Sequence, residues 1–163
     1  MKKLNFGCGL DIKKGWDNID IQTDERLTNS FNFNKIPYPI KSNTYDYIYM
    51  RMIIEHLEKP DLVLHELHRI CKEGAIIRVI TSYYNNKGSY NDMEHLHYFS
   101  DETFKHFVNE TVRLEKKKKF EIELLELKPT VVGRIFPKFI REKLPIFIGG
   151  LIGIIIVDLK VKK

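Results

Sequence analysis

Two strand-like segments near the start of the chain lie unusually close together. Residues 4–6 (LNF) form an apolar run that ends at Gly7 and Gly9, and residues 16–21 (WDNIDI) form a second run. A glycine turn between two parallel strands normally leads into a full helix. Here Asp20 follows Gly9 by only eleven positions, so that helix shrinks to residues 10–15. Any fold proposed for the chain has to accommodate this shortened connection.

The rest of the chain alternates strand-like and helix-like segments. This alternation predicts an α/β class fold, a single Rossmann-like domain with a mostly parallel sheet flanked by helices. Aromatic and branched residues favour the pleated surface of a sheet, and the late segments alternate apolar and charged residues. Besides 4–6 and 16–21, strands are predicted at residues 31–33, 45–50, 75–80, 120–127 and 153–161.

Two helices are predicted between these strands. The first begins at Pro60, which suits the first helical position, and carries an apolar face that reaches Cys71 before Gly74 stops it. The second is capped by Ser100 and has acidic residues at 101–102, which favour a helix N-terminus.

Length and composition indicate one domain over residues 1–163, with a core in 1–113 and a C-terminal part of strands plus an apolar and basic segment in 114–163. The chain has 163 residues, 43% of them hydrophobic, which is enough for one sizeable core. A net charge of +5 is typical of a solvated surface. The two cysteines lack a disulfide pattern, and no secretory signal follows Met1, so a cytoplasmic protein is expected.

Several motifs in one order carry a family resemblance. They are LNFGCG, NIDI, a proline-containing turn before YDYIYM, Glu-His-Leu at 55–57, a helix ending RICKEG, and HYFSDETFKHF. The chain resembles the class I S-adenosylmethionine-dependent methyltransferases, and most closely their small, short-looped type. The resemblance covers roughly residues 3–110 and implies a methyltransferase that uses S-adenosyl-L-methionine as cofactor. It also implies that the last strand is antiparallel.

The resemblance assigns cofactor-binding roles at the carboxyl ends of the strands. The glycine loop would approach the ligand through its backbone, and the Asp20 carboxylate would accept hydrogen bonds from the ribose diol. Residues 32–34 would flank the adenine, and residues 50–51 would lie near the methionine end. The shortened helix favours this cofactor over a dinucleotide, because S-adenosylmethionine has no phosphate for a helix N-terminus to bind. The predicted set is Phe6, Gly7, Cys8, Gly9, Asp20, Asn32, Phe33, Asn34, Met50 and Arg51.

Catalytic candidates lie in residues 93–99 (MEHLHYF), a region that borders the acceptor in the family. His95 or His97 could remove a proton from the acceptor near neutral pH, but the favoured explanation of the segment is two loop histidines that only satisfy local hydrogen bonds. The HELH segment at 65–68 lacks the spacing of a metalloprotease site, and no metal ligand is predicted.

The acceptor is predicted to be a small molecule or a glycan or lipid precursor. Residues 81–86 (TSYYNN) lack the motif typical of base-amino methylation, which makes nucleic acid an unfavoured partner. Two alternatives remain: a degenerate, non-catalytic Rossmann-like binding module, and an RNA methyltransferase that uses the basic clusters. Residues 134–157 mix apolar and basic positions; burial in the sheet or a homodimer surface is favoured there over peripheral membrane contact.

Overall fold

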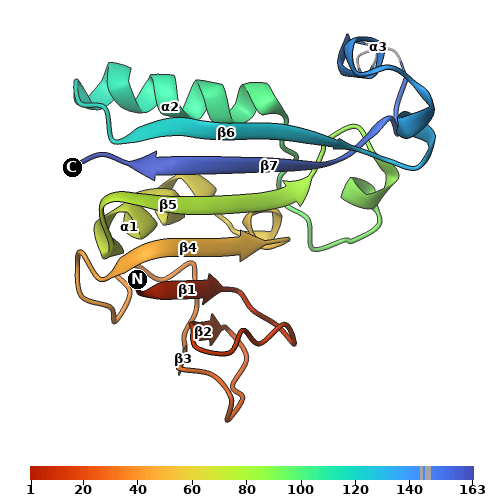
Figure 1. Ribbon diagram of the computed structural model, residues 1–163. Helices are drawn as coiled ribbons and strands as arrows, with labels where there is room; N and C mark the ends of the chain where they lie inside the picture. The colour runs from red at the N-terminus through yellow and green to blue at the C-terminus, as the bar shows by residue number, and fades with distance from the viewer. Residues whose placement is uncertain (144, 146–147) are drawn as a thin grey trace.

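The computed structural model describes residues 1–143, 145 and 148–163. Both chain termini lie at one end of the sheet, and the segment around α3 projects from the opposite end (Figure 1). The elements in chain order are β1 (Lys3–Phe6), β2 (Asp17–Asp20), β3 (Asn29–Ser30), β4 (Tyr45–Arg51), η1 (Ile54–His56), α1 (Pro60–Ile70), β5 (Cys71–Ser82), η2 (Lys87–Tyr90), α2 (Asp101–Glu115), β6 (Phe120–Pro129), η3 (Val132–Ile135), α3 (Lys138–Lys143) and β7 (Ile152–Val161).

Seven strands form one sheet in the order β3-β2-β1-β4-β5-β7-β6. The pairs from β3 to β5 are all parallel, and β7 runs antiparallel to both β5 and β6. This confirms the predicted α/β fold class and the antiparallel last strand. Strand β1 pairs in parallel with β4, and Leu4 lies opposite Ile48. Of the apolar and basic segment 134–157, residues 152–157 belong to β7, while residues 144, 146 and 147 lie outside the described residues.

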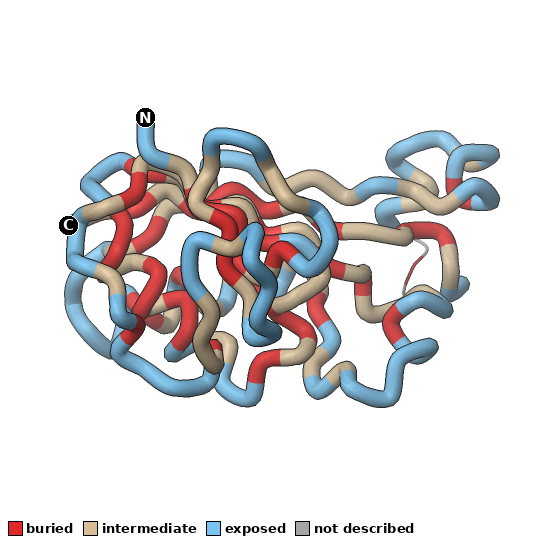
Figure 2. The backbone as a smooth tube through the Cα atoms, turned by 90° about the horizontal axis from the view of Figure 1, so that it is seen from below, coloured by how far each residue is buried: buried red, intermediate tan, exposed pale blue. Residues whose placement is uncertain are grey.

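Helices α1 and α2 cover the same face of the sheet (Figure 1). Phe107 of α2 packs against both His65 of α1 and Phe120 of β6, with ring centroids 5.6 and 5.3 Å apart. Strand residues on this face are almost fully buried, and they form the continuous buried band through the middle of the molecule in Figure 2. Members of this band include Leu4, Phe6, Ile48, Met50, Ile77, Val79, Ile155, Val157 and Leu159.

No helix among the described residues covers the opposite face of the sheet. At the β1 end, Trp16 packs edge-on against Tyr47 and Tyr49, and the Lys3 and Lys13 ammonium groups lie over these rings, at 5.0 Å from Trp16 and 4.7 Å from Tyr49. Amphipathic side chains of this kind shield apolar surface while they keep their charge in water. Trp16 and the two lysines occupy the place that a full helix after the glycine loop would take.

Farther along the same face, strands β5 and β7 are joined by a bidentate ion pair. Arg78 Nε and Nη2 lie 2.7 and 2.6 Å from the Asp158 carboxylate oxygens. Paired hydrogen bonds of this geometry fix side-chain orientation as well as adding energy. The ion pair therefore supports the register of the antiparallel half of the sheet without a covering helix.

The shortened connection between β1 and β2 is held by two buried asparagines. Asn18 Oδ1 accepts hydrogen bonds from the Lys13 N–H at 2.9 Å and from Asn5 Nδ2 at 3.0 Å, and its Nδ2 donates to the Lys13 and Trp16 carbonyls. Asn5 Nδ2 also donates to the Asp11 carbonyl at 2.7 Å. These bonds satisfy loop backbone groups that a helix would satisfy internally.

Three sequence-based predictions of local structure were wrong. Residues 31–33 are not a strand; β3 holds only residues 29–30, after which the chain turns. Strand β5 starts at Cys71 rather than at residue 75, because Gly74 adopts φ +74° inside an irregular stretch instead of ending the helix. A bulge between Ile122 and Leu124 of β6 moves Leu124 out of the predicted alternation and leaves it exposed.

The predicted helices are confirmed. Helix α1 starts at Pro60, and α2 starts after Ser100. The Ser100 side chain accepts the Thr103 N–H, and the Thr103 side chain accepts the Ser100 N–H.

In the C-terminal segment, α3 buries none of its residues, and Ile135 and Phe139 are strongly exposed. None of the helices within the described residues is long and apolar enough to cross a membrane.

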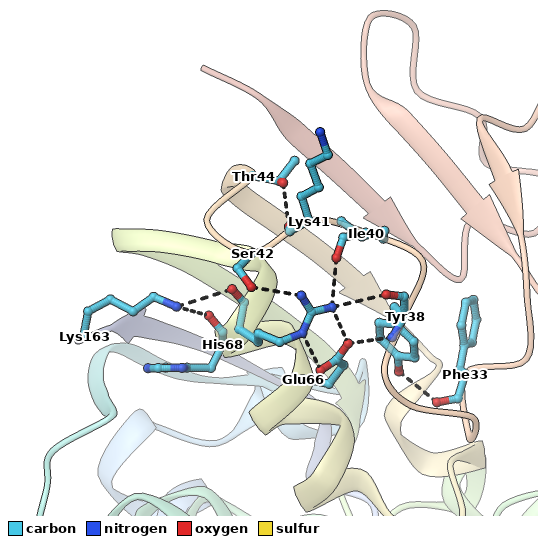
Figure 3. Close-up of polar contacts among 10 residues, drawn as sticks. Phe33, Tyr38, Ile40, Lys41, Ser42, Thr44, Glu66, His68 and Lys163 are labelled. Atoms are coloured by element: carbon cyan, nitrogen blue, oxygen red, sulfur yellow. Dashed lines mark hydrogen bonds and ion pairs between the residues drawn. The ribbon is translucent and has the colours of Figure 1, made fainter.

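An ion pair on α1, between the buried Glu66 and the partly exposed Arg69, holds the turn that precedes β4 (Figure 3). The Glu66 carboxylate accepts hydrogen bonds from Arg69, at 2.6 and 2.8 Å, and from the Tyr38 N–H. Arg69 in turn donates to the carbonyls of Tyr38 and Ile40, and the Tyr38 hydroxyl donates to the Phe33 carbonyl at 2.8 Å. This network fixes residues 33–40 against the helix.

We expect the substitution Glu66→Gln to lower the free energy of unfolding by about 1 to 3 kcal/mol, because it leaves Arg69 without its carboxylate. Burial raises the pKa of Glu66, but the Arg69 and Tyr38 hydrogen bonds outweigh it and hold this pKa below the ordinary value. The wild-type advantage should therefore be full at neutral pH and shrink as the pH falls below the ordinary glutamate range.

Urea unfolding of both proteins between neutral and acidic pH measures this difference. Glu110→Gln is the matched control, because Glu110 pairs with Arg113 at the same i,i+3 spacing on an exposed surface. A Glu66→Gln variant as stable as the control variant would contradict the proposed clamp.

Candidate cofactor and acceptor site

The order in which successive strands are added to the sheet reverses between β1 and β4. Strands β2 and β3 extend the sheet on one side of β1, and β4 and β5 extend it on the other. Open α/β sheets bind ligands outside the carboxyl ends of their strands at such a switch point. The carboxyl edge is defined here as the side where β1, β2, β4 and β5 end, at Phe6, Asp20, Arg51 and Ser82.

The glycine loop follows β1 at this edge and is tightly packed at Gly7. Gly7 and Cys8 donate their N–H groups to the Ile19 carbonyl at 3.0 and 3.1 Å, which turns the chain back over β2. Gly7 has φ +67°, and a Cβ there would meet Ile53 Cγ1 at 2.4 Å. Gly9 also has positive φ, +49°, but nothing lies within 4 Å of the corresponding Cβ position. Gly7 is therefore required for packing, while Gly9 leaves open space at the edge.

The Asp20 carboxylate is hydrogen-bonded to the glycine loop. Its Oδ2 accepts the Gly9 N–H at 2.7 Å, and its Oδ1 accepts the Gln22 N–H at 3.2 Å. A carboxylate can accept about four hydrogen bonds, so two directions remain for a ligand. The structure thus brings together Gly9 and Asp20, which are eleven positions apart in the sequence. The Asp20 carboxylate stabilises the glycine loop and can still accept further hydrogen bonds.

Three predicted site residues point their side chains into the core. Phe6 and Met50 are fully buried, and Phe33 is 6% exposed with its ring centroid 4.1 Å from that of Phe6. Their side chains shape the floor beneath the carboxyl edge. Any contact between Phe6 or Met50 and a cofactor would involve their backbone, and the stacking of Phe33 against a base, expected from the sequence, would require its ring to leave Phe6.

The two asparagines that flank Phe33 are occupied by local bonds. Asn32 Oδ1 accepts the Asn34 N–H at 2.8 Å, and Asn34 Oδ1 accepts the Glu58 N–H at 3.0 Å. Each retains its side-chain NH₂ group as a donor. The predicted contact with the edge of a base stays a prediction for both residues.

Cys8 and Arg51 differ in their exposure. Burial raises the pKa of the Cys8 thiol, and the negative charge of Asp20 raises it further, so the thiol stays protonated at neutral pH. This agrees with a filler role rather than a nucleophile. Arg51 ends β4, is exposed, and has no salt bridge within the described residues, so its guanidinium is available to an anionic ligand at the carboxyl edge.

The two candidate catalytic histidines have separate surroundings. The His95 ring packs edge-on against the His56 ring, with centroids 4.7 Å apart, and its Nδ1 lies 2.8 Å from the Ser89 carbonyl. His97 Nε2 lies 3.4 Å from the Glu58 carbonyl. The structure therefore does not pair them, and a role for either in proton transfer stays a prediction.

An aromatic groove lies beyond the end of β5. It has a volume of about 500 Å³ and is lined by Tyr83, Tyr84 and Tyr98, with Glu142 and Pro145 on its far side. Burial raises the pKa of Tyr83 to about 12, with Asp101 as a further cause, so its hydroxyl remains a donor at neutral pH. Tyr98 also stacks on Tyr90, with ring centroids 4.8 Å apart.

The HELH histidines have structural contacts, as the sequence indicated. His68 Nε2 lies 2.7 Å from the Lys162 carbonyl, and both rings pack against Phe120. Burial lowers the pKa of each of these histidines. They lie on α1, with His68 facing the residue after β7, and not at the carboxyl edge.

Comparison with known proteins identifies the family. A sequence profile described as a methyltransferase domain matches residues 5–112, which is more than half of the chain. The chain belongs to the methyltransferase domain family. This confirms the predicted family and enzyme class, and it agrees with S-adenosylmethionine as methyl donor. No curated protein matches the sequence significantly.

Solved structures share the fold of this methyltransferase-family chain at low identity. A putative methyltransferase from Bacillus halodurans aligns with 99% of this chain and 93% of its own at TM-score 0.66 and 12% identity. An S-adenosylmethionine-dependent methyltransferase from Mesorhizobium loti aligns over 98% and 90% at TM-score 0.65 and 13% identity. The [4+2]-cyclase SpnF aligns over 99% and 74% at TM-score 0.67 and 14% identity. At this identity the likeness concerns the fold alone.

We expect Gly7→Ala to destabilise the protein more than Gly9→Ala. Both substitutions place a Cβ at positive φ, which costs about 1 to 2 kcal/mol, but only the first also drives a Cβ into Ile53. Thermal unfolding of the two variants compares these costs directly. Equal melting temperatures would show that the contact between Gly7 and Ile53 is not tight.

Proposed function

We propose that this chain transfers a methyl group from S-adenosylmethionine to a small-molecule acceptor or to a glycan or lipid precursor. The observation that carries the proposal is the Asp20 carboxylate beside Gly9 at the switch point of a methyltransferase-family sheet. The remaining acceptor capacity of that carboxylate suits a ribose diol.

The shape of the glycine loop supports a cofactor without phosphate. Residues 7–16 contain no helix, so the carboxyl edge has no helix N-terminus at the place where dinucleotide enzymes bind a pyrophosphate. Backbone approach at Gly9 and the Asp20 carboxylate do not need that helix. In this proposal Arg51, which is exposed at the end of β4, binds a carboxylate such as that of the methionine moiety.

The acceptor class is supported by the aromatic groove and by α3. Tyrosine rings offer flat apolar faces with polar tips, which suit sugar rings and lipid-linked groups. Helix α3 contributes Glu142 to this groove, and Phe139 of α3 and Ile135 of η3 are exposed in the same basic segment. An amphipathic basic segment suits an acceptor presented at a lipid surface. Peripheral membrane contact is therefore part of this proposal, and a homodimer through the same residues is the competing explanation.

An RNA acceptor is less well supported. In the lysine run 116–119, Lys119 pairs with Glu115 at 2.5 Å and Lys118 pairs with Glu121 at 3.1 Å. Carboxylates at these lysines reduce the positive potential that phosphate binding requires. A non-catalytic binding module stays the second alternative, because the likeness to a [4+2]-cyclase shows that this fold does not fix the reaction.

We expect Asp20→Asn to weaken binding of S-adenosylhomocysteine by about ten- to a hundredfold, because an amide replaces one charge-assisted acceptor. A modest loss of stability should accompany it, since the Asn side chain has one oxygen for the two bonds to Gly9 and Gln22. Calorimetric titration and thermal unfolding on the same variant measure both effects.

Asp24→Asn serves as the control. Asp24 is an exposed residue in the following loop, and the hydrogen bonds that its carboxylate accepts come from Arg26. Its affinity for S-adenosylhomocysteine should equal that of the wild type. Unchanged affinity in Asp20→Asn would remove Asp20 from the site, and no heat with the wild-type protein at millimolar ligand would favour the non-catalytic alternative.

The acceptor itself can be sought with labelled cofactor. Incubation of the protein with radiolabelled S-adenosylmethionine and separated cell fractions should label the glycan or lipid-precursor fraction, or a small molecule. Label that enters RNA instead would support the RNA methyltransferase alternative.

A further inference from the structure

A cavity at the carboxyl ends of β4 and β5 gathers four potential metal ligands. It has a volume of about 470 Å³, and its walls include Glu55 and His56 from η1 and Asp92 and His95 from the segment after η2. The sequence analysis predicted no metal ligand, and it used Glu55 and His56 only as part of the family motif. Segments almost forty residues apart in the chain therefore supply this cluster.

Backbone hydrogen bonds bring the two segments together. The Glu55 carbonyl accepts the N–H groups of Leu96 and His97 at 2.8 and 3.2 Å. The residue before them, His95, consequently lies beside His56, the residue after Glu55. The juxtaposition is thus fixed by the main chain and does not depend on the ion.

His95 is oriented as metal-binding histidines usually are. Its Nδ1 lies 2.8 Å from the Ser89 carbonyl, which can only accept a hydrogen bond. In the neutral ring the proton is therefore on Nδ1, and the Nε2 lone pair is free. A histidine ligand typically donates its other N–H to a carbonyl in this way, because the bond fixes the ring and its tautomer.

The donor atoms are close enough for one ion. One ligand atom each of His56, Asp92 and His95 lie within 4.8 Å of one another. Ligands bonded at about 2.0 to 2.2 Å lie roughly 3 to 4 Å apart around one ion, so a small side-chain adjustment suffices. One Asp92 oxygen already accepts the Glu94 N–H at 2.9 Å, which leaves the other oxygen for coordination.

The burial of the Glu55 carboxylate is an independent observation that favours a cation in the cavity. Its side chain is only 1% exposed, yet neither carboxylate oxygen has a hydrogen-bond partner within the described residues. A buried polar group without a partner costs free energy, and a buried charge costs more unless it is paired or coordinates a metal. A cation between the histidines and Glu55 would provide that compensation.

We propose that His56, Asp92 and His95 bind one divalent first-row transition-metal ion, of which Zn²⁺ and Mn²⁺ are the test cases, and that the Glu55 carboxylate in the same cavity wall helps to balance its charge. Two carboxylates balance the charge of the ion, and two imidazoles favour these metals over Mg²⁺ and Ca²⁺, which prefer oxygen ligands. Because the cavity opens to solvent, positions remain for an oxygen ligand, as in catalytic rather than structural metal sites.

Calorimetric titration of the full-length, chelator-treated protein with ZnCl₂, MnCl₂ and MgCl₂ tests the proposal without any cofactor. We expect one Zn²⁺ or Mn²⁺ per chain, bound at least about tenfold more tightly than Mg²⁺. His95→Gln and Glu55→Gln should each weaken this binding at least about tenfold. His97→Gln, in the same segment but outside the cluster, should bind as the wild type does.

The melting temperature of the metal-free protein gives a second measurement. Glu55→Gln should melt no lower than the wild type, because it removes a buried unpartnered charge. No Zn²⁺ or Mn²⁺ binding, equal binding by His95→Gln and wild type, Mg²⁺ binding as tight as Zn²⁺, or a much lower melting temperature for Glu55→Gln would each overturn the proposal. A failure of S-adenosylhomocysteine to bind would leave these results unaffected, so the two proposals fail separately.

Discussion

The hydrogen bonds of Asn18 and Asn5 set the architecture of this protein, because they close the crossover between β1 and β2 without a helix. Parallel strands normally need a connection of about a dozen or more residues, most often helical. Here both amide groups are buried, and Asn18 uses all of its donors and acceptors on the loop and on Asn5. The parallel pairing therefore survives although the backbone hydrogen bonds within the loop form only isolated turns, at Cys8–Asp11, Leu10–Ile12 and Lys13–Trp16.

Two consequences follow from this short crossover. On the helix-free face, Trp16 and two lysines take the place of a helix, and the Arg78–Asp158 ion pair supports the neighbouring strands. At the carboxyl edge, the Gly9 N–H meets the Asp20 carboxylate instead of a phosphate. The short crossover thus uncovers one face and leaves the Asp20 carboxylate at the carboxyl edge, where the proposed cofactor site lies. Ile53, which packs on Gly7, directly precedes η1, whose Glu55 and His56 line the cavity.

Much of the fold could be predicted from the sequence, because its signals are local. Pro60 and Ser100 mark helix starts whose caps depend on only a few neighbouring residues. The wrong predictions depend on tertiary context: Gly74 looks like a helix stop but lies in an irregular strand, and the bulge at Leu124 has no sequence marker. The strand expected at 31–33 fails because Phe33 packs into the core beneath the turn that Glu66 and Arg69 hold.

The site was predictable only in part. The short spacing of Gly9 and Asp20 placed them at adjacent strand ends, and the structure joins them. By contrast, the partnership of His56 with His95 arises from backbone bonds between distant segments, which no periodicity reveals. The Glu-His-Leu motif and the histidines of residues 93–99 were visible separately, but their contact required the three-dimensional structure.

The central claim is that the carboxyl edge around Gly9 and Asp20 binds S-adenosylmethionine although the helix after the glycine loop is missing. Amide chemical shifts of ¹⁵N-labelled protein titrated with S-adenosylhomocysteine test it most directly. The account predicts that the largest shifts fall on residues 7–9, 20–22 and 32–34. Saturable shifts centred elsewhere on the sheet, or none at millimolar ligand, would contradict it.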